Sequence, residues 1–465
     1  MAIDTVPAST QSSVIDERGM GMNELPVVVI GAGPVGLAAA AELVERGLEP
    51  LVLERGPRAG AAVAAWNHVR LFSPWSELVA PAAGRLLEKT GWTRPDSEAC
   101  PTGSDWAGSY LRPLAEALSD RVRFGAEVTG VARRGRDRVV DSGRDDEPFT
   151  VHVRSADGSE ERIAARAVID ASGTWTTPNP LGGEGLPAAG ERTAADRIGY
   201  RVPDLGDETV RARYAGKHVV VAGSGHSALT ALVALSGLAK DSASTRISWV
   251  LRRGSVGDTF GGGDADQLPA RGALGLRARA AVDAGLITVV TGFRTEAVER
   301  DGDGRLSLLS SAGQRLGQVD EVVTLSGFRP DLTWLSEIRL ELDPTLQAPV
   351  ALAPLIDPNV HSCGTVYPHG AKELAHPEKD FYLAGMKSYG RAPTFLAMTG
   401  YEQVRSIAAE LAGDHEAAAR VELRMAETGV CGGAGLFDEP DDAPAAGGCC
   451  AAPEPVALSL GVTSR

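Results

Sequence analysis

Residues 27–36 read Val27-Val28-Val29-Ile30-Gly31-Ala32-Gly33-Pro34-Val35-Gly36, an apolar run followed by three closely spaced glycines. Its four leading β-branched residues predict a buried strand, and the Ala-rich pattern that continues to Arg46 predicts a helix. Residues 50–54, Pro-Leu-Val-Leu-Glu, predict the next strand. A strand, a glycine turn, a helix and a second strand form the first unit of a doubly wound domain with a parallel sheet.

Each glycine of this motif has its own physical role. Gly31 permits the tight turn, Gly33 lets the backbone approach a pyrophosphate, and Gly36 lets helix and strand pack closely. The phosphates would lie at the helix N-terminus, and Glu54 would accept a hydrogen bond from a ribose hydroxyl. A glycine turn in an ordinary βαβ unit is the alternative. Because strand, helix and acidic residue are all in place, the pattern favours a nucleotide site.

A second unit of the same kind occurs later in the chain. Residues 218–222 predict a strand, Gly223-x-Gly225-x-x-Ala228 follows it, and residues 246–251 predict the next strand after a helix. The third glycine position is occupied by alanine, which is also found in such motifs. One chain therefore carries two predicted dinucleotide-binding units.

The second unit differs from the first at the end of its second strand. Arg252 and Arg253 stand at the position that Glu54 holds in the first unit. A carboxylate there would repel a ribose 2′-phosphate and two arginines would attract one, so the sequence favours NADPH over NADH. Solvated arginines at a strand end are the alternative. His226, inside the turn, either faces the cofactor or simply begins the helix.

Length and composition limit the possible classes of protein. The chain has 465 residues, of which 43 % are hydrophobic, and a formal net charge of −15. This length suggests two or three domains, and the negative charge argues against nucleic acid or an anionic membrane as the main partner. The chain has five cysteines and no secretory pattern at its start, so we expect reduced thiols and a cytoplasmic protein.

In the first nucleotide unit the second strand ends in an acidic residue, and in the second unit it is followed by two arginines. This order resembles the two-dinucleotide-binding-domain flavoproteins, and among them the flavin-containing monooxygenase-like group. The resemblance covers roughly residues 25–412. It rests further on residues 170–174 and 324–331, which are similar to the two segments that join the domains of this family, and on residues 66–74, which are similar to its flavin-side stretch. It implies FAD in the first unit and NADPH in the second.

The resemblance also implies which residues hold each cofactor. Those for FAD are Gly31, Gly33, Gly36, Glu54, Arg55, Trp66, Gly173 and Gly385. Those for NADPH are Gly223, Gly225, Ala228, Arg252 and Arg253.

The implied fold class is α/β, with two Rossmann-like dinucleotide-binding domains and a flexible cysteine-containing tail at the C-terminus. The FAD domain would be discontinuous, formed by residues 25–180 and 326–412, with an inserted NADPH domain at 181–325. Residues 1–24 are expected to form a disordered leader, and residues 413–465 a C-terminal helix and tail.

The sequence departs from the family pattern at three places. The monooxygenase fingerprint Phe-x-Gly-x-x-x-His is not found before the second glycine motif, where residues 213–217 stand instead. Gly385-Met386-Lys387 replaces a Gly-Asp pair that holds the flavin's ribityl chain in many relatives. The sequence contains neither Cys-x-x-Cys nor Cys-x4-Cys. Reduction of a disulfide by the usual route is therefore not expected.

Three cysteines of the tail form a candidate metalloid site. Cys449 and Cys450 are adjacent, and Cys431 lies eighteen positions upstream. Soft thiolates bind soft acceptors such as trivalent arsenic, and a flexible linker of this length spans roughly 20–25 Å, so three thiolates could meet. An incidental cysteine pair that simply oxidises is the alternative. The tail resembles those of flavoproteins linked to arsenic resistance and the vicinal pair of mercuric reductase.

The substrate pocket is predicted only from position, and no catalytic residue is assigned. His68 and Arg70 would lie near the flavin ring if the family architecture holds, and either could bind an oxyanion. Arg391, together with Lys387, flanks the closing flavin segment. Cys363 is either a substrate-side thiol or a small core residue.

These observations predict an oxidoreductase in which NADPH reduces FAD and molecular oxygen accepts the electrons. The sharpest hypothesis is a monooxygenase or oxidase that converts a trivalent arsenical, methylated or not, to the pentavalent form. A metal or metalloid reductase that uses the tail cysteines is one alternative. A non-enzymatic flavoprotein that binds As(III) at its tail thiols is the other. The sequence leaves the oligomeric state open.

Overall fold

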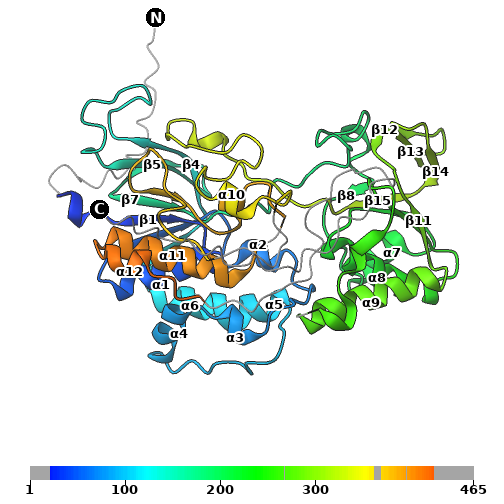
Figure 1. Cartoon of the computed structure of the whole chain (residues 1–465), viewed down its shortest axis with the longest axis horizontal. Coiled ribbons are helices and arrows are strands. Elements are labelled where there is room, and N and C mark those ends of the chain that lie inside the picture. The colour runs from blue at the N-terminus through cyan, green and yellow to red at the C-terminus, as the bar shows by residue number, and fades with distance from the viewer. Residues whose placement is uncertain (1–20, 267, 361–367, 394, 424–465) are drawn as a thin grey trace, which may run out of the picture.

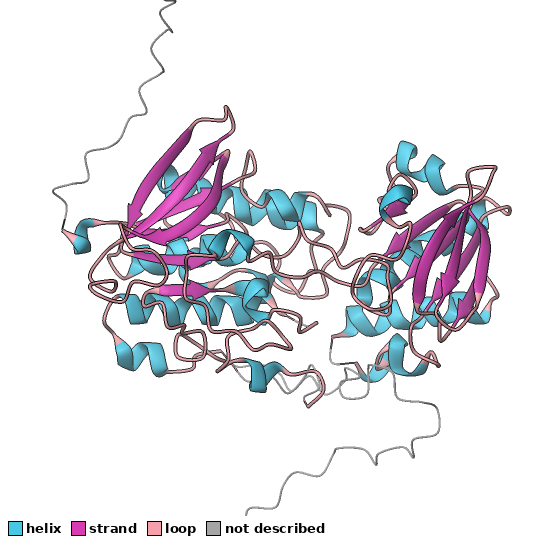
Figure 2. Cartoon of the chain, turned by 90° about the horizontal axis from the view of Figure 1, so that it is seen from above, coloured by secondary structure: helices cyan, strands magenta, loops and turns pink. Residues whose placement is uncertain are grey.

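The computed structural model describes residues 21–266, 268–360, 368–393 and 395–423. Figure 1 shows two lobes that lie side by side, and Figure 2 shows the same two lobes from above. Of the described residues, those in 21–178 and 328–423 form the first lobe, and those in 179–327 form the second. The first lobe is thus built from two separate segments of the chain.

A parallel sheet of five strands lies at the centre of the first lobe, in the order β16-β7-β1-β2-β3. Its strands are β1 Val27–Ile30, β2 Pro50–Glu54, β3 Val122–Phe124, β7 Ala167–Asp170 and β16 Phe381–Leu383. The central strand β1 pairs in parallel with β7 on one side and with β2 on the other. The carboxyl ends of these strands therefore meet at one edge, where a ligand of such a sheet binds.

Both faces of this sheet are covered, which explains why β1 is apolar throughout. Val27 and Val29 face a core shared with helices, whereas Val28 and Ile30 face a core shared with a three-stranded antiparallel sheet. The helices of this lobe are α1 Pro34–Glu45, α2 Ala61–Ala64, α3 Trp75–Leu78, α4 Pro81–Glu88, α5 Gly103–Trp106, α6 Arg112–Leu118, α10 Ala353–Ile356, α11 Ala397–Leu411 and α12 His415–Ala419. The antiparallel strands are β4 Ala126–Arg133, β5 Phe149–Ser155 and β6 Glu160–Ala165.

The second lobe repeats this three-layer arrangement. Its parallel sheet has the order β11-β10-β9-β15-β8, formed by β8 Ile198–Gly199, β9 His218–Ala222, β10 Arg246–Val250, β11 Ile287–Val290 and β15 Glu321–Thr324. Helices α8 His226–Asp241 and α9 Pro269–Asp283 cover one face, and α7 Glu208–Tyr214 packs beside them. The antiparallel strands β12 Thr295–Arg300, β13 Leu306–Ser310 and β14 Arg315–Val319 cover the other.

The structure confirms the predicted fold class. Both predicted units of strand, glycine turn, helix and strand are present, as β1-α1-β2 and β9-α8-β10. The longest helix of the second segment of the first lobe is α11, which begins at Ala397 and ends at Leu411. The exact domain boundaries, the leader and the tail stay predictions, and most of the leader and tail lies outside the described residues. Within the described ranges, no helix is long and apolar enough to cross a membrane.

Two neighbouring segments connect the lobes. Pro178 and Phe328 form an isolated antiparallel bridge, and Asn179 N donates to Gly327 O at 2.9 Å. The Arg329 guanidinium donates to Asn179 Oδ1 at 2.7 Å and to Gly185 O at 3.0 Å. The two crossing segments are therefore bonded to one another rather than independent linkers.

A buried ion cluster joins the antiparallel sheet of the first lobe to the segment before β16. Glu378 accepts from Arg133 Nε at 2.8 Å and from Arg144 Nη2 at 2.7 Å, and all three side chains are buried. Burial alone would raise the pKa of Glu378, but hydrogen bonds from Arg144 and Arg133 outweigh burial and lower this pKa. The cluster joins elements that lie 245 positions apart in the sequence.

We expect Glu378→Gln to lower the free energy of unfolding by about 3–5 kcal/mol, because it leaves two buried guanidinium groups without their carboxylate. The pKa of Glu378 is lower in the folded state, so the ion pairs stabilise fully above its unfolded pKa of about 4.3. That stabilisation is lost as the pH falls through the folded pKa, and the two proteins should then converge. Denaturant unfolding at several pH values measures this, with exposed Glu160→Gln as the matched control. Equal stability of both variants at pH 7 would contradict the role of the cluster.

Candidate dinucleotide sites

The first glycine motif brings backbone into contact with backbone at the carboxyl edge of the sheet. Gly31 has φ +98°, and a Cβ there would lie 2.9 Å from Ala171 O. A Cβ on Gly36 would lie 1.9 Å from Gly31 O, a distance that no pair of non-bonded atoms adopts. Both positions therefore require glycine, since α1 crosses directly over the end of β1.

Gly33, the N-cap of α1, is different because a Cβ there would meet nothing within 4 Å. The glycine is not needed for packing within the chain, so the open space suits the approach of a pyrophosphate to the helix N-terminus. Glu54, at the end of β2, lies beside it: Oε2 accepts from Ala32 N at 2.8 Å and Oε1 from Gly56 N at 2.7 Å. Each carboxylate oxygen keeps a lone pair for a ribose hydroxyl. This geometry fits the adenosine half of FAD.

The other predicted FAD residues lie around the same edge. Arg55 is exposed, with its guanidinium 3.8 Å from Glu127. Trp66 is half-buried, and its ring packs 6.4 Å from that of Trp106. Gly173 and Gly385 both have positive φ, and a Cβ on Gly173 would meet nothing within 4 Å. Their roles toward FAD stay predictions.

A buried ion pair at this edge was not found by sequence reasoning. Lys387 Nζ lies 2.7 Å from Asp170 Oδ2, and the side chains are 1 % and 0 % exposed. The same ammonium donates to Ser172 Oγ at 3.2 Å and lies over the ring of Trp334. The charge of Lys387 thus joins β7 to the turn after β16, and the role of Lys387 beside the closing flavin segment stays a prediction. The available signal in the sequence was a lysine that directly follows the small and apolar residues 383–386, a setting in which an unpaired charge is unfavourable.

The second glycine motif has the same geometry in the second lobe. Gly223 has φ +128°, and a Cβ there would lie 2.4 Å from Leu325 O. Gly225, the N-cap of α8, has nothing within 4 Å of a built Cβ, like Gly33. Ala228 is completely buried at the position of the third glycine. The open N-terminus of α8 fits a second pyrophosphate.

The residues proposed to select NADPH follow β10 directly. Arg252 is exposed and donates to Gly183 O at 3.4 Å, and Arg253 is half-buried. Both lie at the carboxyl edge, as a 2′-phosphate site requires. His226 is the first residue of α8, and its ring lies edge-on to Phe72 of the first lobe at 5.4 Å between centroids. The flavin-side loop of one lobe therefore touches the glycine turn of the other.

The predicted substrate residues do not form one cluster. His68 Nδ1 lies 3.8 Å from Asp204 Oδ2 of the second lobe, and its buried Nε2 has no hydrogen-bond partner within the described residues. Arg70 donates to Cys100 O, and exposed Arg391 donates to Gln347 Oε1 at 3.0 Å. Cys363 lies outside the described residues. Among the three of these residues that the structure describes, His68 alone has a buried polar atom without a hydrogen-bond partner.

The three candidate metal ligands, Cys431, Cys449 and Cys450, also lie outside the described residues. In the part of the chain that the structure describes, no group of three or more His, Cys, Asp or Glu side chains could hold a metal ion. Cys100 is described there as a free thiol, and burial raises its pKa. The tail site stays a prediction.

Comparison with known proteins agrees with this geometry. The profile of the family "Pyridine nucleotide-disulphide oxidoreductase" matches residues 28–352, which include both glycine motifs. The chain belongs to this family. Family membership confirms the predicted enzyme class, an oxidoreductase that uses a pyridine nucleotide, and the two nucleotide units fit the predicted FAD and NADPH.

Among curated proteins, an opine oxidase subunit of Agrobacterium tumefaciens (strain Ach5) is 28 % identical over 162 residues. The match spans 35 % of this chain and 26 % of the length of that relative.

Two solved structures have the same fold as this chain over nearly their whole length. Bacillithiol disulfide reductase of Bacillus cereus is 20 % identical, with a TM-score of 0.61 over 84 % of this chain and 99 % of that one. The FAD-bound cadaverine monooxygenase of desferrioxamine biosynthesis from Erwinia amylovora is 14 % identical, with a TM-score of 0.60 over 87 % and 98 %. The same fold therefore serves both disulfide reduction and oxygenation, and the acceptor must be argued from the residues of this chain.

Gly33 and Gly225, which both face open space, allow the assignment of FAD to the first site and NADPH to the second to be tested in parallel. We expect Gly33→Ala to weaken FAD binding by at least about tenfold, or 1.4 kcal/mol, because the new methyl group occupies the space of the pyrophosphate. Gly225→Ala should weaken NADP⁺ binding similarly and leave FAD affinity unchanged. Fluorescence titration of each variant with each dinucleotide measures this, and each variant is the control for the other. If both variants bound both dinucleotides normally, the assigned sites would be wrong.

The arginine pair predicts the choice of nicotinamide cofactor. We expect Arg252→Gln with Arg253→Gln to reduce the preference for NADPH over NADH by roughly 10- to 100-fold, because charge-assisted hydrogen bonds to a 2′-phosphate are lost. The ratio of kcat/KM for flavin reduction by the two cofactors measures it. Arg192→Gln with Arg277→Gln, an exposed pair of the same lobe, is the control. An unchanged ratio would place the 2′-phosphate elsewhere.

Proposed function

We propose that this protein is an NADPH-dependent FAD monooxygenase or oxidase that acts on a soft nucleophile, with a trivalent arsenical as its substrate. Two observations together support oxygen as the electron acceptor. Both predicted dinucleotide sites have open space at their helix N-termini, and the sequence contains no Cys-x-x-Cys or Cys-x4-Cys pair. When bound, FAD supplies the two-electron chemistry between NADPH and the final acceptor. Without a dithiol relay, that acceptor must reach the flavin edge as a small molecule, and oxygen is the simplest one.

The chain's own residues would bind and orient the cofactors. The N-terminus of α1 at Gly33 would hold the FAD phosphates, and Glu54 would fix the ribose. The N-terminus of α8 at Gly225 would hold the NADPH phosphates, and Arg252 with Arg253 would select the 2′-phosphate. The buried pair of Lys387 and Asp170 would keep the turns at the flavin edge in register.

The arsenical is proposed from the chemistry of thiolates and from one polar atom between the lobes. Cys431, Cys449 and Cys450 would capture trivalent arsenic, a soft acceptor, and deliver it from the tail. His68 supports a polar ligand between the lobes, because its buried Nε2 is unsatisfied by the described residues. In the balanced reaction NADPH supplies two electrons, one oxygen atom goes to arsenic, and the other leaves as water.

A second candidate is a metal or metalloid reductase that receives electrons through Cys449 and Cys450, and a third is an arsenic-binding carrier. The vicinal cysteines favour both over a simple oxidase. A reductase would need the tail to reach the flavin edge, since no other cysteine pair occurs in the sequence. The carrier would bind arsenite tightly with negligible NADPH turnover.

The decisive experiment is anaerobic reduction of the FAD-loaded protein by NADPH in a stopped-flow instrument, followed by mixing with oxygen, with and without methylarsonous acid. We expect oxygen to reoxidise the flavin and the arsenical to yield one pentavalent product per NADPH. Cys449→Ser with Cys450→Ser should keep NADPH oxidation by oxygen but lower arsenical turnover. If the reduced flavin ignored oxygen and were reoxidised anaerobically by Hg²⁺ or an arsenical, the reductase would replace this proposal. Arsenite binding without NADPH turnover would instead identify the carrier.

A further inference from the structure

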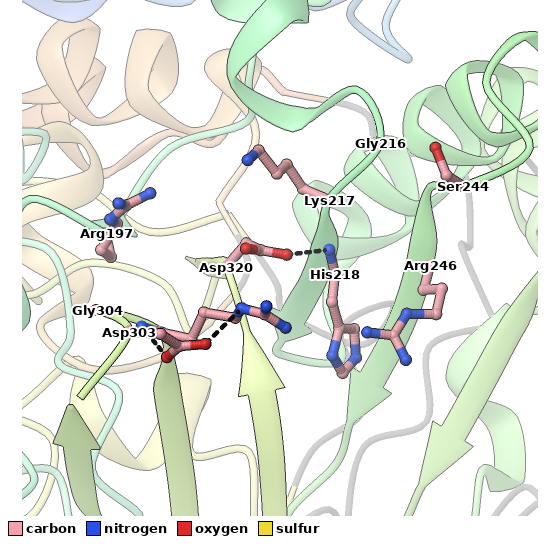
Figure 3. A pocket seen from close by; sticks show the side chains of 10 residues that line it. Arg197, Gly216, Lys217, His218, Ser244, Arg246, Asp303, Gly304 and Asp320 are labelled. Atoms are coloured by element: carbon pink, nitrogen blue, oxygen red, sulfur yellow. Dashed lines mark hydrogen bonds and ion pairs between the residues drawn. The ribbon is translucent and has the colours of Figure 1, made fainter. Parts of the chain in front are cut away.

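A basic cavity lies at the edge of the second lobe opposite its glycine turn. Figure 3 shows this cavity, which has a volume of about 450 Å³ and is lined mainly by residues that begin strands or precede them. Lys217 directly precedes β9, Arg246 begins β10 and Asp320 directly precedes β15. A strand of five residues separates Lys217 from Gly223, or about 17 Å at 3.3 Å per residue. The cavity is therefore distinct from the dinucleotide site.

The lining carries an excess of positive charge in a chain that is acidic as a whole. Four basic residues and two acidic ones line the cavity, whereas the chain has a net charge of −15. A concave surface lined by one sign of charge focuses the electric field and concentrates counter-ions. Repulsion among the cations is relieved when an anion binds between them.

The acidic residues of the lining are already engaged. Asp320 Oδ2 accepts from His218 N at 2.8 Å, and Asp303 lies 3.1 Å from Arg305 Nε. Arg197 Nη1 lies 3.1 Å from Glu321 Oε1, so this guanidinium already has a carboxylate partner. Among the described residues, by contrast, no carboxylate lies within ion-pair distance of the Lys217 ammonium or the Arg246 guanidinium.

The His218 ring, which lines the cavity, has a polar partner at each of its nitrogens. The buried His218 ring lies 3.0 Å from Gln318 O and 2.8 Å from Ser248 Oγ, so both ring nitrogens have partners. Burial, together with Arg246 nearby, lowers the pKa of His218, which stays neutral above that pKa. The positive charge offered to a ligand at neutral pH therefore comes from lysine and arginine alone.

We propose that this cavity binds a small phosphomonoester, with Lys217 and Arg246 as the groups that hold its dianionic phosphate. Arginine and lysine are the residues that recognise phosphate, and in the described chain neither of these two side chains has a carboxylate partner. The volume falls in the range of small-molecule sites and exceeds what a bare phosphate needs. The exposed Ser244 hydroxyl at the rim can donate one further hydrogen bond.

The test is calorimetric titration of the full-length, FAD-loaded protein with ribose 5-phosphate. Saturating NADP⁺ is present throughout, so that Arg252 and Arg253 are occupied. We expect binding that Lys217→Gln with Arg246→Gln weakens at least tenfold and that Arg246→Lys largely retains. Arg162→Gln with Arg277→Gln removes the same charge from exposed positions outside the lining and should bind as the parent protein does.

Thermal unfolding of each variant without ligand shows whether the chain still folds. Loss of stability is not expected, because Lys217 is only half-buried and Arg246 is exposed. Inorganic phosphate should compete with ribose 5-phosphate, and succinate should compete more weakly. No binding by the parent protein, equal binding by the Lys217 and Arg246 double variant, or equal affinity for succinate would each overturn the proposal.

Discussion

At the carboxyl edge of each parallel sheet, backbone approaches backbone so closely that a side chain cannot fit between the two segments. In the first lobe Gly36 leaves no room for a side chain against Gly31 O, and Gly31 leaves none against Ala171. In the second lobe Gly223 lies in the same way against Leu325 O. These contacts place the N-termini of α1 and α8 over the strand ends, so both helices present unpaired backbone N–H groups at the same relative position.

The layers of both lobes follow from this placement. Once a helix is fixed on one face of a parallel sheet, the other face also needs an apolar cover, and a three-stranded antiparallel sheet provides it in each lobe. Two buried ion pairs lie where separate segments meet. Lys387 with Asp170 joins the turn after the last strand to the flavin edge, and Glu378 with Arg133 joins the segment before that strand to β4. These pairs hold the discontinuous first lobe together.

The same edges connect structure to function. The positions that accept no side chain are structural, whereas Gly33 and Gly225, at the two helix N-termini, face open space and leave room for a ligand. The contact of Phe72 with His226 brings the flavin-side loop of one lobe to the nucleotide turn of the other. An oxidoreductase with two dinucleotides needs this proximity, because hydride transfer requires the two cofactors to meet. The basic cavity at the opposite edge is separated from that chemistry by the length of β9.

The two glycine units, the fold class and the predicted cofactors could be inferred without a structure, because tight turns, helix N-termini and strand-end charges are local features with fixed spacing. The sequence did not reveal that Lys387 is buried against Asp170, since 217 positions separate them and only the pairing of β16 with β7 brings them together. The basic cavity is likewise assembled from the starts of separate strands. Contacts between distant segments depend on strand order and register, and local sequence patterns specify neither.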